Sequence, residues 1–196
     1  MTQDELYSLI QDYLQKPPVV IWGSGATIPY GMPSMSDLKH ELGSQFPEIA
    51  KSSDNLESEL GKDCYDGEID TIKKIIWKTI YKKDVHALFR LIEHPSEFDG
   101  IKCLALKFLE PHPQKLNIIT TNYDLVLEHT LAFYNINYTT GFIGHELSSF
   151  NRALFQQNKM IVNIVKVHGS LDLFDIGDSN IRQSTNRDFV DKYIPT

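Results

Sequence analysis

The sequence predicts an α/β fold: a parallel β-sheet flanked by helices, with a helical insertion over about 54–110. Two short apolar runs rich in β-branched residues, 116–121 and 161–167, have the composition of strands buried inside such a sheet. A third apolar run, 18–22, leads into a loop of small residues. Segments with helical periodicity separate these runs, and this alternation is typical of α/β domains.

The first elements follow from capping and turn signals. A helix is expected over 2–15, because Thr2 and Glu5 match a capping box and apolar residues recur at helical spacing. Lys16-Pro17-Pro18 ends this helix and leads into the first strand. After the small-residue loop, Gly31-Met32-Pro33 predicts a turn, and either Ser34 or Ser36 is expected to cap the next helix.

The segment from about 54 to 110 is expected to be mainly helical, since isoleucine, leucine and phenylalanine recur through it at helical spacing. An insertion of this length is too long for a simple crossover between parallel strands. We therefore expect part of it to form a layer over the sheet or a lid.

The second half of the chain alternates again. Pro111-His112-Pro113 ends the helical segment before the 116–121 strand, and a helix is expected over 124–133. A short strand is expected near 137–140, the stretch 150–155 is ambiguous, and the chain from 175 onward is expected to be polar and irregular. Because no repeat or linker divides the chain, we expect a single domain over 1–196.

Composition narrows the classes of function. The formal charge is -7, with no basic stripe, which disfavours direct binding of nucleic acid. No apolar run approaches the roughly 20 residues of a membrane span, and the polar N-terminus is unlike a signal peptide, so we expect a cytoplasmic protein. Cys64 and Cys103 are expected to be partly buried thiols, and the scattered histidines give no metal-ligand spacing, so no metal is expected.

Polar residues follow two of the predicted strands at the point where each strand ends. Asn122 follows the 116–121 run and His168 follows the 161–167 run, while the Gly23–Thr27 loop follows the first strand. Ligands of open parallel sheets bind outside the carboxyl ends of the strands, and small-residue loops there let a backbone approach a phosphate. The three strand ends therefore predict one nucleotide site.

In their order along the chain, these segments resemble the signature segments of the sirtuin superfamily. The resemblance rests on Gly23-Ser24-Gly25-Ala26-Thr27 with Gly31-Met32-Pro33, on Thr120-Thr121-Asn122-Tyr123-Asp124, and on Lys166-Val167-His168-Gly169-Ser170. The second segment is closer to the sirtuin-like NADase domains of bacterial antiphage defence proteins than to protein deacetylases. The resemblance implies a Rossmann-like sheet and NAD as the substrate, and it does not cover the helical insertion.

The resemblance also implies roles for particular residues. Asn122 and His168 are the expected catalytic residues, near the nicotinamide ribose, and the pyrophosphate is expected against the Gly23–Thr27 loop. The expected NAD-binding residues are Gly23, Ser24, Gly25, Ala26, Thr27, Pro33, Thr121, Asp124, Gly169 and Ser170.

The residue types fit the chemistry of breaking the nicotinamide glycosidic bond. Nicotinamide leaves as a neutral molecule, so no strong acid is required. An amide such as Asn122 both donates and accepts, and so can hold a water or a ribose hydroxyl. A histidine can take the proton from that group as charge develops. Asp124 either fixes the nicotinamide amide or caps the following helix. Taken alone, Asn122 is a common turn or cap residue and His168 a common strand-end residue.

Two departures from the family sharpen the expectation. Deacetylase sirtuins carry a zinc module of four cysteines, which a chain with two cysteines cannot supply, and the Phe-Arg of their glycine segment is Met35-Ser36 here. Both argue against deacylation.

Family members also continue into strands that line the adenosine half of NAD. On this comparison the domain is shortened: it is a fragment, or another chain completes it, or it is a degenerate form.

The sequence therefore predicts hydrolysis of NAD to nicotinamide and ADP-ribose by an antiphage defence effector. The alternatives are a module that senses NAD or ADP-ribose without cleaving it, and a purely structural assembly module. Because such activity must be held off until it is needed, control by a homo-oligomer or a regulatory partner is expected, with the 54–110 insertion as the contact surface.

Overall fold

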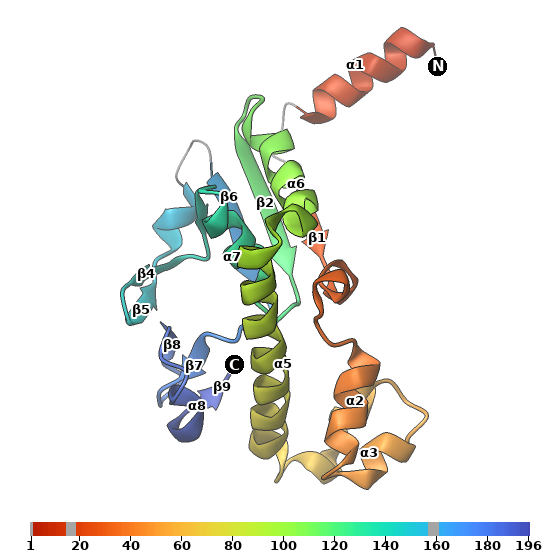
Figure 1. Ribbon diagram of the computed structural model, residues 1–196, viewed down its shortest axis with the longest axis vertical. Coiled ribbons are helices and arrows are strands. Elements are labelled where there is room, and N and C mark those ends of the chain that lie inside the picture. Colours follow the sequence, from red (N-terminus) through yellow and green to blue (C-terminus); the bar gives the residue numbers. More distant parts are fainter. Residues whose placement is uncertain (1, 15–18, 157–160) are drawn as a thin grey trace.

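The computed structural model describes residues 2–14, 19–156 and 161–196 and confirms the α/β fold (Figure 1). Its main sheet is parallel and has the strand order β1-β2-β6-β3. The strands are β1 (Val19–Trp22), β2 (Lys115–Thr120), β6 (Ile161–Lys166) and β3 (Tyr138–Thr139). Trp22 pairs with Thr120 and Thr120 with Lys166, so the carboxyl ends of three strands lie at one edge.

The helical insertion covers one face of this sheet. Its main helices are α5 (Ile69–Glu93) and α6 (Asp99–Leu109), joined by the 3₁₀ turn η4 (Pro95–Phe98), and α7 (Val126–Phe133) packs beside them. In β2 every second residue is buried, and Leu116 and Ile118 join the same apolar core as Leu91 and Ile101. The expected layer over the sheet is therefore confirmed.

The opposite face of the sheet is partly open. Val19 and Ile21 of β1 are 58% and 75% exposed, and Val165 of β6 is 40% exposed. Parallel sheets are usually covered on both faces, so this apolar surface is unusual. The turn η5 (Arg152–Gln156) lies near β2, because Lys115 Nζ donates to the carbonyl of Phe155.

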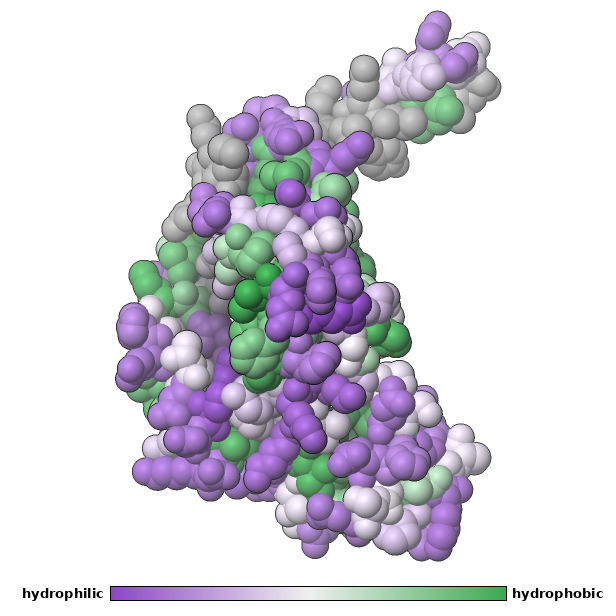
Figure 2. Space-filling view, viewed as in Figure 1, coloured by the Kyte–Doolittle hydropathy of each residue, from purple (hydrophilic) through white to green (hydrophobic). Residues whose placement is uncertain are grey.

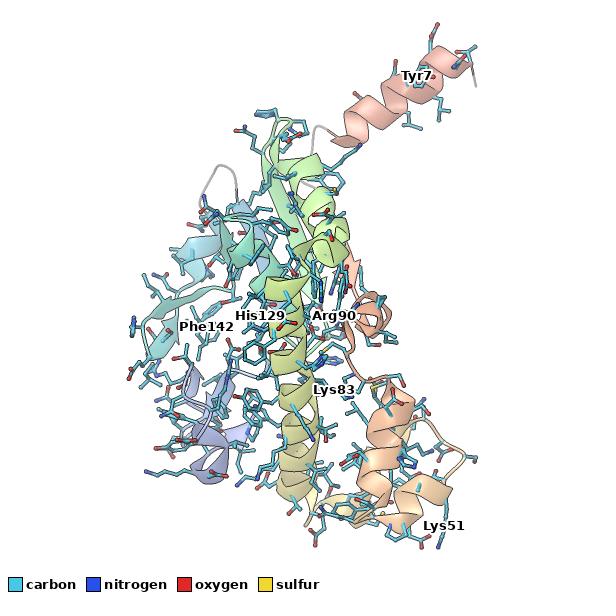
Figure 3. All side chains as sticks on the ribbon, in the orientation of Figure 1. Tyr7, Lys51, Lys83, Arg90, His129 and Phe142 are labelled. Carbon is cyan, nitrogen blue, oxygen red and sulfur yellow. The ribbon has the colours of Figure 1, made fainter. Side chains whose placement is uncertain are left out.

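The expected caps are present at the first helices. Thr2 and Glu5 form the capping box of α1 (Gln3–Leu14), a helix whose Leu6 and Tyr7 are exposed; Figure 3 shows Tyr7 on α1, away from the sheet. The Ser34 hydroxyl caps α2 (Met35–Gly43), which resolves the choice between Ser34 and Ser36. The predicted Gln15 and the 15–18 junction lie outside the described residues.

A second apolar cluster joins α2 to the insertion. Leu38 and Leu42 of α2 pack with Ile72 and Trp77 of α5, and the Trp77 indole N–H donates to the carbonyl of Leu171. Trp77 is thus a core residue, as expected, and Trp22 packs against the main core. The chain between β1 and α5 also forms several short elements: η1 (Ser24–Ala26), η2 (Ile28–Tyr30), α3 (Pro47–Lys51), α4 (Leu56–Leu60) and η3 (Asp63–Tyr65).

The expectation of an irregular chain from 175 onward is wrong. A second sheet, antiparallel, has the order β4-β5-β8-β7-β9. Its elements are β4 (Phe142–Gly144), β5 (Leu147–Phe150), β7 (Leu173–Asp175), β8 (Ile181–Ser184) and β9 (Ile194–Pro195), with α8 (Phe189–Lys192) between the last two strands. Strands of two to four residues are too short to show alternation, so their sequence carried no signal.

Smaller expectations also change. Helix α7 begins at Val126 rather than at 124, and the ambiguous 150–155 stretch is the end of β5 followed by η5. Cys64 and Cys103 are exposed rather than partly buried. In the described part of the chain, no helix combines the length and apolarity needed to cross a bilayer.

Candidate active site at the carboxyl edge of the sheet

Three loops converge at the carboxyl edge of the parallel sheet. The Gly23–Thr27 loop follows β1, Asn122 follows β2, and His168 follows β6. Two cavities lie at this edge, and Ile76, Ile80, Tyr123 and His168 line both of them. The two cavities are therefore neighbours with a common wall.

The first of these, the Asn122 cavity, has a volume of about 170 Å³. Most of the residues expected from the sequence line it: Ser24, Thr27, Pro33, Thr121, Asn122, Asp124 and His168. Helices α2, α4 and α5 supply its apolar walls through Leu38, Leu56 and Ile80. Gly25 and Ala26 line neither cavity, although they belong to the same loop.

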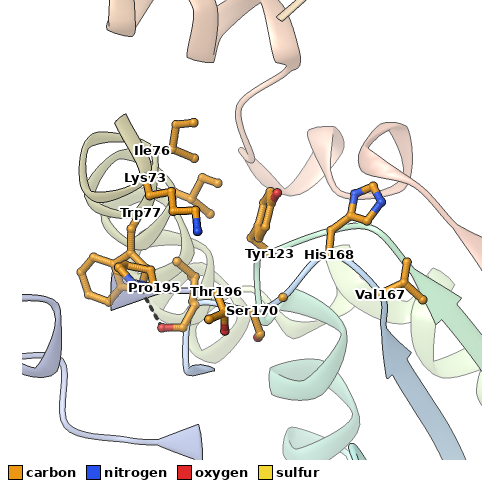
Figure 4. A pocket seen from close by; sticks show the side chains of 12 residues that line it. Lys73, Ile76, Trp77, Tyr123, Val167, His168, Ser170, Pro195 and Thr196 are labelled. Atoms are coloured by element: carbon orange, nitrogen blue, oxygen red, sulfur yellow. Dashed lines mark hydrogen bonds between the residues drawn. The ribbon is translucent and has the colours of Figure 1, made fainter. Parts of the chain in front are cut away.

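The second, the Lys73 cavity, has a volume of about 370 Å³ (Figure 4). It is lined by Lys73, Ile76, Trp77, Ile80, Tyr123, Val167, His168, Gly169, Ser170, Leu171, Pro195 and Thr196. The expected residues His168, Gly169 and Ser170 thus reach this cavity from the end of β6. The wall on the other side comes from α5.

Asn122 is held firmly and still offers one free acceptor. Its side chain is buried, and Nδ2 donates to the carbonyl of Gly23 at 3.2 Å and to Oγ1 of Thr27 at 3.1 Å. Gly23 therefore takes part in the site through its main chain. Within the described residues, Oδ1 of Asn122 is buried and has no hydrogen-bond partner. A ligand donor in this cavity would satisfy it.

Asp124 has two structural partners. Its Oδ2 accepts a hydrogen bond from Thr27 Oγ1 at 3.0 Å, and its Oδ1 accepts the N–H of Val126, the first residue of α7, at 3.2 Å. Asp124 therefore supports the start of the helix and also lines the cavity. Burial raises the pKa of its carboxyl, and the nearby Lys166 opposes this only in part.

The Gly23–Thr27 loop is a 3₁₀ turn rather than an open phosphate cradle. The N–H groups of Ala26 and Thr27 donate to the carbonyls of Gly23 and Ser24, each at 3.0 Å. Among the described residues, the N–H groups of Ser24 and Gly25 have no such partner. The loop therefore has two main-chain donors left for an anion.

His168 is exposed, and its neighbours are tightly placed. The N–H of Val167 donates to the carbonyl of Thr120, which ties this segment to β2. Gly169 has φ +96°, and a Cβ atom there would lie 1.9 Å from the carbonyl carbon of Thr196. A larger residue would therefore be both strained and blocked. Ser170 is 2% exposed, and its Oγ has no partner in the described part of the chain.

A buried ion pair behind the site was not anticipated. Nζ of Lys166 lies 3.1 Å from Oε1 of Glu128, and the two side chains are 6% and 7% exposed. Nζ also donates to the carbonyl of Asp124. Burial acts to lower the pKa of Lys166, but the carboxylates of Glu128, Asp172 and Asp124 outweigh it and raise that pKa. The sequence feature that could have indicated this ion pair is a lysine at an inward position of an apolar strand.

Asp84 of α5 anchors the same loop from the other side. It is 2% exposed, its Oδ1 accepts the N–H of Leu125 at 2.7 Å, and its Oδ2 lies 3.0 Å from Nε2 of His129. Figure 3 shows His129 beside α5. A single aspartate within a helical pattern gives no sequence signal of this role. The insertion thus positions the segment that carries Asn122.

Fold and geometry together define an α/β protein with two adjoining cavities at the carboxyl edge of a parallel sheet. The model of the SIR2-like domain family matches residues 116–196, which include Asn122, His168 and every strand of the second sheet. Over these residues the chain is similar to that family, in agreement with the resemblance to the sirtuin superfamily. No curated protein matches the chain. Among the described residues, no group of three or more histidine, cysteine or acidic side chains is placed to hold a metal ion.

Proposed function

We propose that this protein hydrolyses NAD to nicotinamide and ADP-ribose. A SIR2-like domain indicates an enzyme family that uses NAD. The observation that carries the proposal is Oδ1 of Asn122, which is buried without a partner among the described residues, on the wall of a cavity that His168 also lines. An acceptor without a partner is costly to bury, so its retention supports a ligand donor at this position.

In the proposed reaction, nicotinamide occupies the Asn122 cavity and departs as a neutral molecule while the ribose gains oxocarbenium character. Oδ1 of Asn122 accepts from the attacking water or a ribose hydroxyl and fixes its position. His168, at the wall between the cavities, takes the proton from that group. Each carboxylate oxygen of Asp124 accepts one hydrogen bond within the protein and has a further lone pair, so Asp124 holds the nicotinamide amide while it still supports the start of α7.

We further propose a biological setting from the family resemblance: a cytoplasmic antiphage effector that depletes NAD. An enzyme of this kind is harmful unless it is held inactive. Control by a second copy or by a regulatory partner is therefore part of the proposal, and the exposed side of the 54–110 insertion is its contact surface.

The decisive measurement is nicotinamide release from NAD by the wild type, Asn122→Ala and His168→Ala. Each variant should lose activity about 100-fold or more, because positioning or proton transfer is removed. His145→Ala, at an exposed position outside both cavities, is the matched control and should retain full activity. Undiminished turnover by both site variants would refute this mechanism.

A second candidate is a module that binds NAD or ADP-ribose without cleaving it. It is favoured by the exposure of His168, which forms no hydrogen bond with the described residues, whereas a catalytic histidine is usually oriented by a partner. Calorimetric binding of NAD with no nicotinamide release under any condition of assembly would select this candidate over hydrolysis.

A further inference from the structure

We propose that Lys73 of α5 binds a phosphate group of the dinucleotide, and that the Lys73 cavity holds the phosphate-bearing part of the ligand. This inference rests on the proposed function, and it adds a binding residue from the insertion. Neither the motifs nor the SIR2-like match, which begins at 116, includes this residue.

The position of Lys73 carries the first part of the inference. Figure 4 shows its ammonium group pointing from α5 into the space between that helix and Tyr123. Within the described ranges 2–14, 19–156 and 161–196, Lys73 forms neither an ion pair nor a hydrogen bond. Ion pairing therefore does not account for its placement at the cavity.

The charges of the two cavities are segregated. Among the described side chains, Lys73 is the lysine that lines the Lys73 cavity, whereas the Asn122 cavity is lined by Glu57 and Asp124 and by no described lysine or arginine. NAD has a cationic nicotinamide ring at one end and two phosphates further along. A cationic ring favours the acidic wall, and phosphates favour the ammonium.

The remaining walls suit such a ligand. Lys73 is exposed, and the apolar side chains of Ile76, Trp77 and Val167 line the cavity beside it, so an anion seated against them is less screened from Lys73 than in open water. At the same cavity, the buried Oγ of Ser170 lacks a partner among the described residues. It is a second group that a phosphate oxygen or ribose hydroxyl would satisfy.

The Gly23–Thr27 loop alone supplies little for a pyrophosphate. Two of its N–H groups are engaged in the 3₁₀ turn, and no lysine or arginine of the described part of the chain lines the cavity beside it. A dinucleotide carries two negative charges on its phosphates, which favours a cation within reach. Lys73, across the shared wall of Tyr123 and His168, provides that cation.

The test is calorimetric titration of ADP-ribose and of adenosine, its phosphate-free part, into the wild type, Lys73→Met, Lys73→Arg and Lys74→Met. ADP-ribose lacks the bond that the enzyme would cleave, so binding is measured without turnover. Loss of a hydrogen bond to a charged group should weaken ADP-ribose binding by roughly tenfold or more in Lys73→Met. Adenosine binding should be unchanged, and Lys73→Arg should restore much of the affinity.

Lys74→Met is the matched control, because Lys74 is the next residue of α5 and lines neither cavity. It should bind ADP-ribose as the wild type does. Raising the salt concentration should weaken the wild type more than Lys73→Met, since the lost contact is ionic. Equal affinity of wild type and Lys73→Met for ADP-ribose would overturn the inference. If the wild type binds neither NAD nor ADP-ribose, the proposed function itself fails.

Discussion

At the scale of single residues, the site consists of polar groups held in place by other polar groups. Asn122 is fixed through the amide that donates to Gly23 and Thr27, and this leaves its acceptor for a ligand. Thr27 also donates to Asp124, so one hydroxyl lies between both side chains. In the proposed reaction, this arrangement holds Asn122 in position before the ligand binds, as in a preorganised site.

The raised pKa of Asp124 predicts how stability depends on pH. A carboxyl whose folded-state pKa lies above its ordinary 3.8 binds its proton more tightly in the folded protein. Its stabilising contribution is complete below about 3.8 and is lost as pH rises through the raised value. In urea denaturation, the free energy of unfolding of the wild type should therefore fall relative to Asp124→Asn as pH rises from about 4 to 7.

Asp63→Asn, at an exposed position in η3, serves as the control for that measurement. The free energy of unfolding of Asp63→Asn should differ little from that of the wild type at every pH. If the wild type instead becomes more stable relative to Asp124→Asn as pH rises, the pKa of Asp124 is lowered in the folded protein and not raised.

At the scale of elements, α5 links the insertion to the site. It supplies Trp77 to the second core, Lys73 to one cavity and Asp84 to the loop before α7. The sequence predicted that this segment is helical and covers the sheet, because hydrophobic periodicity reports a buried face. It did not predict that Asp84 accepts from Leu125 or that Lys73 lines a cavity with His168, because these residues lie far apart in the chain and meet only through packing.

Replacing Asp84 tests this link. Asp84→Ala leaves the buried N–H of Leu125 without its acceptor, which should lower the free energy of unfolding by about 1–3 kcal/mol. The amide of Leu125 should also exchange its hydrogen faster than in the wild type. Lys82→Ala, at an exposed position half a turn away on α5, is the control. If the amide hydrogen of Leu125 exchanges at the same rate in Asp84→Ala as in the wild type, the hydrogen bond from Leu125 to Asp84 does not hold this loop in place.

At the scale of the whole molecule, several apolar surfaces are exposed, and two of them adjoin the main sheet and its covering helices. One is the open face of the sheet, where Val19 and Ile21 lie uncovered, and the other is on α5, where Phe89 and Ile92 are 59% and 56% exposed. Figure 2 shows an apolar patch over the upper half of α5 among largely hydrophilic surroundings. Exposed apolar patches rimmed by polar residues are typical of interaction surfaces.

The proposed control through the insertion predicts that α5 mediates assembly. The double variant Phe89→Glu, Ile92→Glu should sediment at a lower mass than the wild type, because buried carboxylates oppose an apolar contact. Ile21→Glu, on the open face of the sheet, should leave the mass unchanged. If the mass falls only in Ile21→Glu, the insertion is not the contact surface and the sheet face takes that role.

The sequence by itself determined the parallel sheet, the covering helices and the polar residues at the strand ends. These depend on local signals: buried strands are apolar along their length, helices show periodicity, and Ser34 caps its helix within one turn. Only the tertiary structure decided the short antiparallel sheet, the Lys166–Glu128 pair, the Asp84 anchor and the division of the site into an acidic and a cationic cavity. Each of these depends on residues distant in the chain, whose meeting is set by packing rather than by any local pattern.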